Sequence, residues 1–389
     1  MKIISCYFSL VFMTLIYCGT TNDSYTIEFI EGKKIIHNLS PKWGSKPEIE
    51  LELIREIGGI DTDDENYAFF VPKDLVKDSR NNIYILDAGN YRIQKFDEQW
   101  NYLSTIGRRG WGPAEFSSPV HMIMDADENL YAADNSKIVV SILNKEGKEI
   151  KSLKLKQQVL RSFQLNSTGN LVLPNPGGNT LVQIKNAEED LIREFGEPKE
   201  YDDKRFNVRG NAISMVLDNR DNIYVTFTYQ NRIEGYSSDG KLIFSSDRPV
   251  NYDISTSMAI KEKKFKGAVL MMPEVNKVSQ AIAVDDKSRL WVVTYKRQET
   301  DEELVVISFP GVELAADDKK FVPTIQRFGN TELKITDLFE FEIFDENGIL
   351  LQKIDITHYC DNIYIYDDRL YILDSSRTMA VYEYRIVEK

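Results

Sequence analysis

The sequence has few of the residues that usually build a catalytic or metal centre. Only three His and three Cys occur among 389 residues. It contains no Gly-x-Ser-x-Gly elbow, no glycine-rich phosphate loop and no His-Glu-x-x-His pair. It therefore gives no motif for a serine hydrolase, a nucleotide hydrolase or a zinc protease. The histidines are His37, His121 and His358, and the cysteines are Cys6, Cys18 and Cys360.

An excess of positive charge is also missing. The chain has 48 Lys and Arg against 61 Asp and Glu, which gives a formal net charge of −13. Such a surface repels phosphate backbones and anionic membranes, and no basic stripe interrupts it. We therefore expect no nucleic-acid partner, and membrane contact only through an anchor.

Long apolar runs are absent except at the N-terminus. Residues 3–17 are nearly all apolar and too short to span a membrane comfortably, which indicates a secretory signal. The following Cys18-Gly19 resembles a bacterial lipobox, whose Cys becomes the acylated N-terminus, although Tyr17 stands where the lipobox has Gly, Ala or Ser. We predict a signal peptide over residues 1–18 with Cys18 as the lipidation site. An uncleaved anchor and ordinary signal cleavage are the alternatives.

This assignment places the protein outside the cytoplasm, in the periplasm or attached to the outer membrane. The mature chain then holds only Cys360 besides Cys18, so an internal disulfide framework is excluded. Residues 19–44 are expected to form a polar tether and an N-terminal segment, and residues 45–389 to form one domain.

A short phrase recurs six times within that domain. Each copy is a β-branched and aromatic run that follows an Asp- or Asn-rich turn, which is typical of a hairpin entering a strand. Such repeats in an all-β chain indicate a propeller or a solenoid. The spacings between the first four copies, 47, 41 and 52 residues, fit a four-stranded blade. The equivalent central residues are Tyr84, Tyr131, Val172, Tyr224, Trp291 and Tyr371.

The remaining strands follow the same plan. Asp-Gly, Glu-Gly and Asn-Gly pairs after the phrase are expected to form two-residue hairpins between the third and fourth strands. The last repeat ends after a third strand over 380–386, and residues 50–57 can supply the missing fourth. We therefore predict a six-bladed β-propeller closed by an N-terminal strand. Insertions over 249–277, with a short helix or flap, and over 295–339 account for the two longest spacings.

One part of the chain also resembles a known repeat family. Residues 83–96 (IYILDAGNYRIQKF) and the connector at 107–119 (GRRGWGPAEFSSP) are similar to the NHL repeat, which covers about 71–119 here. From about residue 45 the chain resembles six-bladed propeller lipoproteins of Gram-negative bacteria. Some relatives of the NHL type, such as the amidating lyases, bind metal with residues around the central channel. Gluconolactonase-like propellers do so in a related ring.

A candidate site follows from the repeat itself. Propellers place ligands at the channel mouth, where the innermost strands converge. Counting ten residues back from each central residue gives one position per blade. Two carboxylates and one imidazole among them predict a possible Ca²⁺ or Zn²⁺ site of Asp74, His121 and Asp361. Polar residues solvated around a wet channel are the alternative. The six positions are Asp74, His121, Ser162, Ser214, Ala281 and Asp361.

Two functional hypotheses remain. The first is a binding or scaffold protein of the cell envelope that presents a propeller face, shaped by the two insertions, to a protein, small molecule or glycan. The second is a metal-dependent hydrolase or lyase at the channel mouth, with the metal activating water or polarising a carbonyl. The sparse metal ligands favour the first. Trp100 and Trp111 lie in or near blade connectors, and we expect both to pack between blades. The alternative for Trp111 is an exposed side chain that contacts a glycan or a partner.

Overall fold

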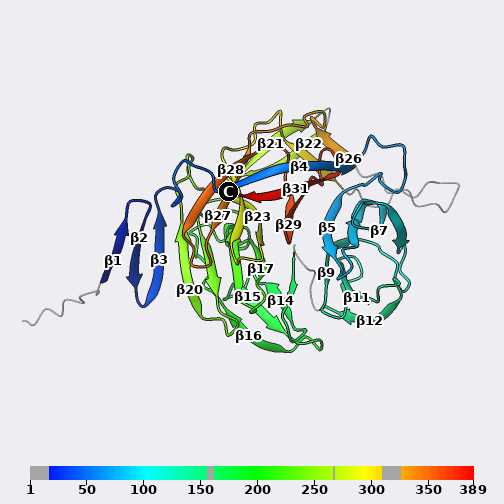
Figure 1. Ribbon diagram of the computed structural model, residues 1–389, viewed down its shortest axis with the longest axis horizontal. Helices are drawn as coiled ribbons and strands as arrows, with labels where there is room; N and C mark the ends of the chain where they lie inside the picture. The colour runs from blue at the N-terminus through cyan, green and yellow to red at the C-terminus, as the bar shows by residue number, and fades with distance from the viewer. Residues whose placement is uncertain (1–16, 156–161, 266–267, 309–325) are drawn as a thin grey trace, which may run out of the picture.

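The chain forms a six-bladed β-propeller, seen in a computed structural model that describes residues 17–155, 162–265, 268–308 and 326–389 (Figure 1). Most of the predicted signal peptide lies outside these residues. The first three blades contain β5 (Pro72–Lys77), β6 (Ile83–Asp87), β7 (Arg92–Phe96) and β8 (Tyr102–Ile106); β9 (Pro119–Met124), β10 (Leu130–Asp134), β11 (Val139–Leu143) and β12 (Glu149–Lys154); and β13 (Gln164–Leu165), β14 (Leu171–Pro174), β15 (Val182–Lys185) and β16 (Leu191–Phe195). The last three contain β17 (Ile213–Leu217), β18 (Ile223–Phe227), β19 (Ile233–Tyr236) and β20 (Leu242–Asp247); β23 (Ser279–Val284), β24 (Leu290–Tyr295), β27 (Phe339–Phe344) and β28 (Leu350–Ile356); and β29 (Asn362–Tyr366), β30 (Arg369–Leu373), β31 (Ala380–Glu388) and β4 (Ile49–Gly58).

The recurring phrase is the second strand of each blade, as predicted. Because blades stack face to face, both faces of these strands are covered, and Tyr84 and Trp291 are fully buried. Each buried aromatic donates a hydrogen bond to the Asp of the preceding turn: the Tyr84 hydroxyl to Asp78 at 3.1 Å and Trp291 Nε1 to Asp285 at 2.9 Å. The Asp and the aromatic residue recur together because the buried carboxylate accepts the hydrogen bond that the buried aromatic side chain donates.

The turns between third and fourth strands differ from the prediction. In the second blade the Gly147 amide donates to Asn144 O at 2.8 Å, and the register shifts by one residue between Ile142 and Leu143. Within this turn, residues 144–148, only Gly147 has a positive φ, of 80°. A two-residue type I′ turn needs two such residues, so the connection is a type I turn followed by a one-residue bulge.

Ring closure by the N-terminal segment is confirmed. β4 pairs antiparallel with β31 from Ala380↔Gly58 to Glu388↔Ile49 and forms the outer strand of the sixth blade. This pairing joins two segments from opposite ends of the chain, which lie side by side in Figure 1. Closure removes the open sheet edges that a linear array would expose.

The sequence did not predict three further strands that precede β4. β1 (Tyr17–Asn22), β2 (Tyr25–Ile30) and β3 (Lys33–Asn38) extend the fourth blade to seven strands, with β3 parallel to β20. Ile36 of β3 is fully buried against Phe244 and Leu350. This part of the predicted tether segment is therefore packed against the propeller.

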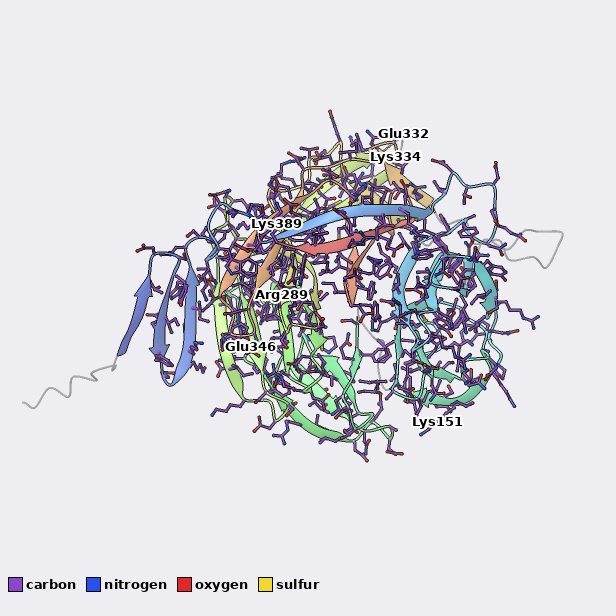
Figure 2. The ribbon with its side chains drawn as sticks, viewed as in Figure 1. Lys151, Arg289, Glu332, Lys334, Glu346 and Lys389 are labelled. Carbon is purple, nitrogen blue, oxygen red and sulfur yellow. The ribbon has the colours of Figure 1, made fainter. Side chains whose placement is uncertain are left out.

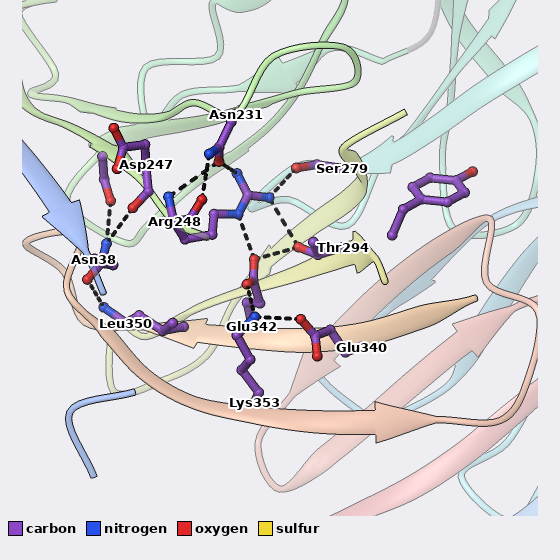
Figure 3. A network of polar contacts seen from close by, with 12 residues as sticks. Asn38, Asn231, Asp247, Arg248, Ser279, Thr294, Glu340, Glu342, Leu350 and Lys353 are labelled. Atoms are coloured by element: carbon purple, nitrogen blue, oxygen red, sulfur yellow. Dashed lines mark hydrogen bonds and ion pairs between the residues drawn. The ribbon is translucent and has the colours of Figure 1, made fainter. Parts of the chain in front are cut away.

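A buried polar network fixes the boundary between the fourth and fifth blades (Figure 3). Arg248, directly after β20, places Nε 2.7 Å from Glu342 Oε2, and both side chains are completely buried. Its Nη2 donates to Ser279 Oγ at 2.7 Å and to Thr294 Oγ1 at 3.1 Å. Nearby, Asn38 Nδ2 donates to the carbonyl oxygen of Gly348 at 3.1 Å. These contacts tie β3 and the two blades together.

Both insertions lie at the same end of the propeller. The first contains a hairpin of β21 (Ala259–Phe265) and β22 (Ala268–Glu274) rather than a helix, and it connects β20 to β23. The second contains β25 (Val305–Ser308) and β26 (Gln326–Gly329) and connects β24 to β27. In an up-and-down blade, the connection leaving the fourth strand and the one leaving the second strand emerge at the same end. We call this end the insertion face and the opposite end the turn face.

Candidate functional site

A central cavity of about 920 Å³ runs along the innermost strands of all six blades. Five of the six positions predicted from the repeat line it, and Ala281 instead packs in the core. A fixed offset from the central residue found the wall because, in five of the six blades, the turn between the innermost strand and the second strand has the same length. The five that line the cavity are Asp74, His121, Ser162, Ser214 and Asp361.

Asp74 and His121 form a buried ion pair across the first two blades. His121 Nδ1 lies 3.0 Å from Asp74 Oδ2, and His121 Nε2 lies 2.8 Å from the carbonyl oxygen of Phe163. Burial lowers the pKa of His121, but the charge of Asp74 and both hydrogen bonds outweigh it, so the net shift is upward. Two acceptors around one imidazole fit the protonated ring. Neither nitrogen is left to bind a metal or to act as a base.

Asp74 is itself fully engaged. Its Oδ2 accepts the Met122 amide at 2.7 Å, and its Oδ1 accepts the Tyr364 hydroxyl at 2.5 Å. Burial and the adjacent charge of Asp74 raise the pKa of Tyr364 well above its usual range. Tyr364 is therefore a neutral hydrogen-bond donor, and the carboxylate links the first, second and sixth blades.

Asp361 makes its hydrogen bonds within the sixth blade, apart from the Asp74–His121 pair. Its Oδ2 accepts the Ser375 amide at 2.8 Å and the Ser376 hydroxyl at 3.1 Å, and burial together with Asp374 raises its pKa. Within the described ranges no three His, Cys, Asp or Glu side chains are placed to hold a metal ion. The structure thus brings the three predicted metal ligands to one cavity wall without assembling them into a site.

The two serines add little to a catalytic arrangement. Ser214 Oγ lies 3.5 Å from the carbonyl oxygen of Gln280, at the limit of a hydrogen bond. Ser162 Oγ is buried and has no hydrogen-bond partner in the described part of the chain. No base contacts either hydroxyl there, so the wall offers polar groups to a ligand rather than an activated nucleophile.

The two ends of the propeller differ sharply in their exposed apolar side chains. Eight large hydrophobic residues on the insertion-face connections are exposed, whereas the described connections of the turn face have none. The turn face consists of Asp-, Asn- and Gly-rich turns with charged residues such as Arg289 and Glu346 (Figure 2). The eight are Ile60, Trp111, Ile138, Val208, Ile260, Val269, Met271 and Ile335.

Trp111 corrects an expectation from the sequence. Its side chain is 71% exposed, while Trp100 is buried and donates from Nε1 to Glu383 at 2.9 Å. Trp100 follows a third strand and closes a turn against the sixth blade, whereas Trp111 lies in a connector on the insertion face. Only Trp100 packs between blades.

The insertions are joined to each other and to the rim. Lys263 of the first pairs with Asp301 of the second, and Lys277 Nζ lies 3.1 Å from Glu299. Arg377 of the sixth blade donates to the carbonyl oxygens of Glu303 and Asn330. Charged residues within 296–303 thus help to dock the second insertion.

Comparisons with known proteins agree with this architecture. Residues 60–171 match the family model DUF5128, described as a 6-bladed beta-propeller. A Bacteroides fragilis structure named as an exported protein is 11% identical with a TM-score of 0.52, covering 91% of this chain and 99% of that one. A Bacteroides vulgatus member of the DUF4221 family is 11% identical with a TM-score of 0.56, covering 88% and 99%.

None of the curated proteins matches this sequence. In the part of the chain that the structure describes, no helix has the length and apolarity needed to cross a bilayer. The family match and the strand pairing agree on one conclusion: the chain folds as a six-bladed β-propeller.

Proposed function

We propose that this chain is an exported, lipid-anchored binding protein of the cell envelope that recognises a protein partner through its insertion face. The observation that carries the proposal is the asymmetry between the two ends. Among the connections of the six blades, those on the end that also bears both insertions carry exposed apolar residues, while the described turns at the opposite end are polar. Large exposed apolar surface on one side of a soluble domain marks an interaction site.

The residue types favour a protein partner over a glycan. Glycan sites rely on aromatic platforms, and Trp111 is the single aromatic among the eight exposed residues. The others are aliphatic, with Met271 66% and Ile335 73% exposed. Methionine and branched aliphatic side chains repack readily against another protein surface.

The anchor and the family resemblance belong to this proposal. A protein named as exported shares the fold, and the lipobox-like Cys18 supplies the attachment. The resemblance of residues 71–119 to the NHL repeat is retained with it. A metal-dependent hydrolase or lyase has less support, because both nitrogens of His121 already have partners.

The test uses photo-crosslinking residues in living cells, placed at Met271 or Ile335, with Ile192 as the control. Ile192 lies on the outer strand β16 of the third blade, is 52% exposed, and belongs to none of the insertion-face connections. One protein should crosslink from both insertion-face positions and not from position 192. Equal crosslinking from all three sites, or none from the insertion face, contradicts the proposal.

The captured protein is then purified and its affinity measured. Met271→Ser combined with Ile335→Ser should weaken binding about 30-fold, as loss of a hot spot of about 2 kcal/mol would do. Ile192→Ser should leave the affinity unchanged. Elemental analysis of the same preparation covers the alternative: one Ca or Zn per chain, lost in His121→Ala, would favour an enzyme.

A further inference from the structure

The position of the predicted lipidation site within the sheet is informative. Cys18 lies in β1, and the register pairs it with Glu28 of β2 and pairs Tyr17 with Phe29. The N-terminal end of β1 is therefore level with the last residues of β2. The next turn, at Glu31–Gly32, leads into β3, so the anchor position lies close to the tip of the β2–β3 hairpin.

The strand directions show at which end of the propeller this tip lies. β20 ends at the insertion face, because it leads directly into the connection that carries β21 and β22. β3 is parallel to β20, so β3 also ends there, and its first residue lies toward the turn face. β2 and β1 alternate in direction, which brings Cys18 and the hairpin tip to the turn-face end. In Figure 1, β1 accordingly begins at the end away from β21 and β22.

The tip has the composition of a segment that rests on lipid. Phe29 and Ile30 are 39% and 47% exposed, although they have the size of core residues. Lys33 and Lys34 follow the turn, and Lys33 Nζ lies 2.6 Å from Glu197 Oε2. Apolar side chains flanked by lysines suit the boundary between headgroups and acyl chains.

The tip is also rigidly connected to the propeller. β1 is three strand spacings from β20, about 14 Å, and every step is a hydrogen-bonded ladder. Ile36 is fully buried, and the Asn38 side chain bonds Ser246 and Gly348. Anchoring at Cys18 would therefore fix the orientation of the whole disc, which a flexible tether would not do.

We propose that the β2–β3 tip, residues 29–34, lies on the lipid surface that holds the acyl chains of Cys18, so that the insertion face points away from the membrane. This inference depends on the lipid anchor in the proposed function. It adds an orientation to that function: the insertion face, which is proposed to bind the partner, is then the face that the membrane does not cover.

The experiment uses the acylated protein purified from cells and placed in vesicles of phosphatidylethanolamine and phosphatidylglycerol that carry nitroxide lipids. A fluorophore is attached to Ile30→Cys or, as the matched control, to Ile335→Cys. Cys360 does not compete for the label, because its side chain is buried and burial raises the pKa of its thiol. Quenching should be several-fold stronger at position 30 than at position 335.

Two readouts separate the inference from the proposal beneath it. The mass of the N-terminal peptide shows whether Cys18 is acylated; an unmodified Cys18 overturns both the anchor and the orientation. An acylated protein with equal quenching at the two positions, or with stronger quenching at position 335, overturns only the orientation. Phe29→Ser should weaken quenching at position 30 and leave acylation intact.

Discussion

Arg248→Met is expected to lower the melting temperature of the protein by about 4 to 6 °C at neutral pH. Arg248 and Glu342 are completely buried with Nε and Oε2 2.7 Å apart, so the substitution leaves a buried carboxylate without its main partner. Removing one member of such a pair costs about 3–5 kcal/mol. The entropy of unfolding for a chain of 389 residues is about 0.8 kcal/mol per kelvin, which converts that loss to the stated shift.

The dependence on pH provides a sharper test than the shift itself. Burial of Glu342 opposes its ionisation, but Arg248 and Lys353 outweigh burial and lower its pKa. In the native protein this carboxylate therefore stabilises the fold above the unfolded pKa, near 4.3, and the contribution is lost as pH falls through the folded pKa. In Arg248→Met the folded pKa rises instead, so protonation relieves the penalty.

The melting-temperature gap between the native protein and Arg248→Met should consequently narrow between pH 7 and pH 5, as followed by circular dichroism. Arg248→Met with Glu342→Met removes both charges and should recover much of the loss. Lys334→Met is the control, because Lys334 makes only an exposed pair with Asp61 at 3.2 Å (Figure 2), and it should change the melting temperature by about 1 °C or less. A gap below about 1 °C, or one independent of pH, would refute the reasoning.

Two further changes test other parts of the fold. Gly348→Ala should cost about 1–3 kcal/mol more than Gly169→Ala, because both glycines have positive φ but only at position 348 would a new Cβ clash with the Phe244 ring. Equal thermal shifts for the two variants would contradict this. Hydrogen bonding to Glu28 raises the pKa of His37 although partial burial opposes it. The stabilisation is complete below the ordinary value of about 6.5 and is lost as pH rises through the folded pKa. Hydrogen exchange in β2 and β3, corrected for intrinsic rates, should therefore accelerate above that pKa, and an unchanged corrected rate would count against the ion pairs.

The sequence predicted the blades because their signal is local. The Asp turn, the central aromatic and the buried second strand lie within about ten residues and satisfy one another, as Asp78 and Tyr84 do. The closing strand was also predictable, because the last repeat lacks a partner. β1 to β3 were missed because their partner β20 is some two hundred residues away. The Glu31-Gly32 pair between two β-branched runs was the available signal.

The site was predicted by position but not by chemistry. A fixed offset from the repeat places Asp74 and His121 on the cavity wall. The sequence could not show that these two side chains turn toward each other across a blade boundary, or that the Phe163 carbonyl takes the remaining imidazole nitrogen. Metal ligation and a satisfied ion pair use the same residues, and only the side-chain directions distinguish them. Apolar exposure on the insertion face was likewise hidden, because a single exposed Met271 resembles a core residue in sequence.

Because the ring is closed by an N-terminal strand, β4 has an unpaired edge during synthesis that could pair with another chain. β4 is synthesised early and β31 much later, so β4 stays unpaired until β31 has been made, and non-local pairing of this kind is slow. An unpaired ten-residue strand could pair with another copy. Exposed charges at Glu50, Glu52 and Glu56 oppose this, because identical strands that meet edge to edge would bring like charges together. The same glutamates face solvent after closure, so protection against mispairing adds no buried charge to the finished propeller.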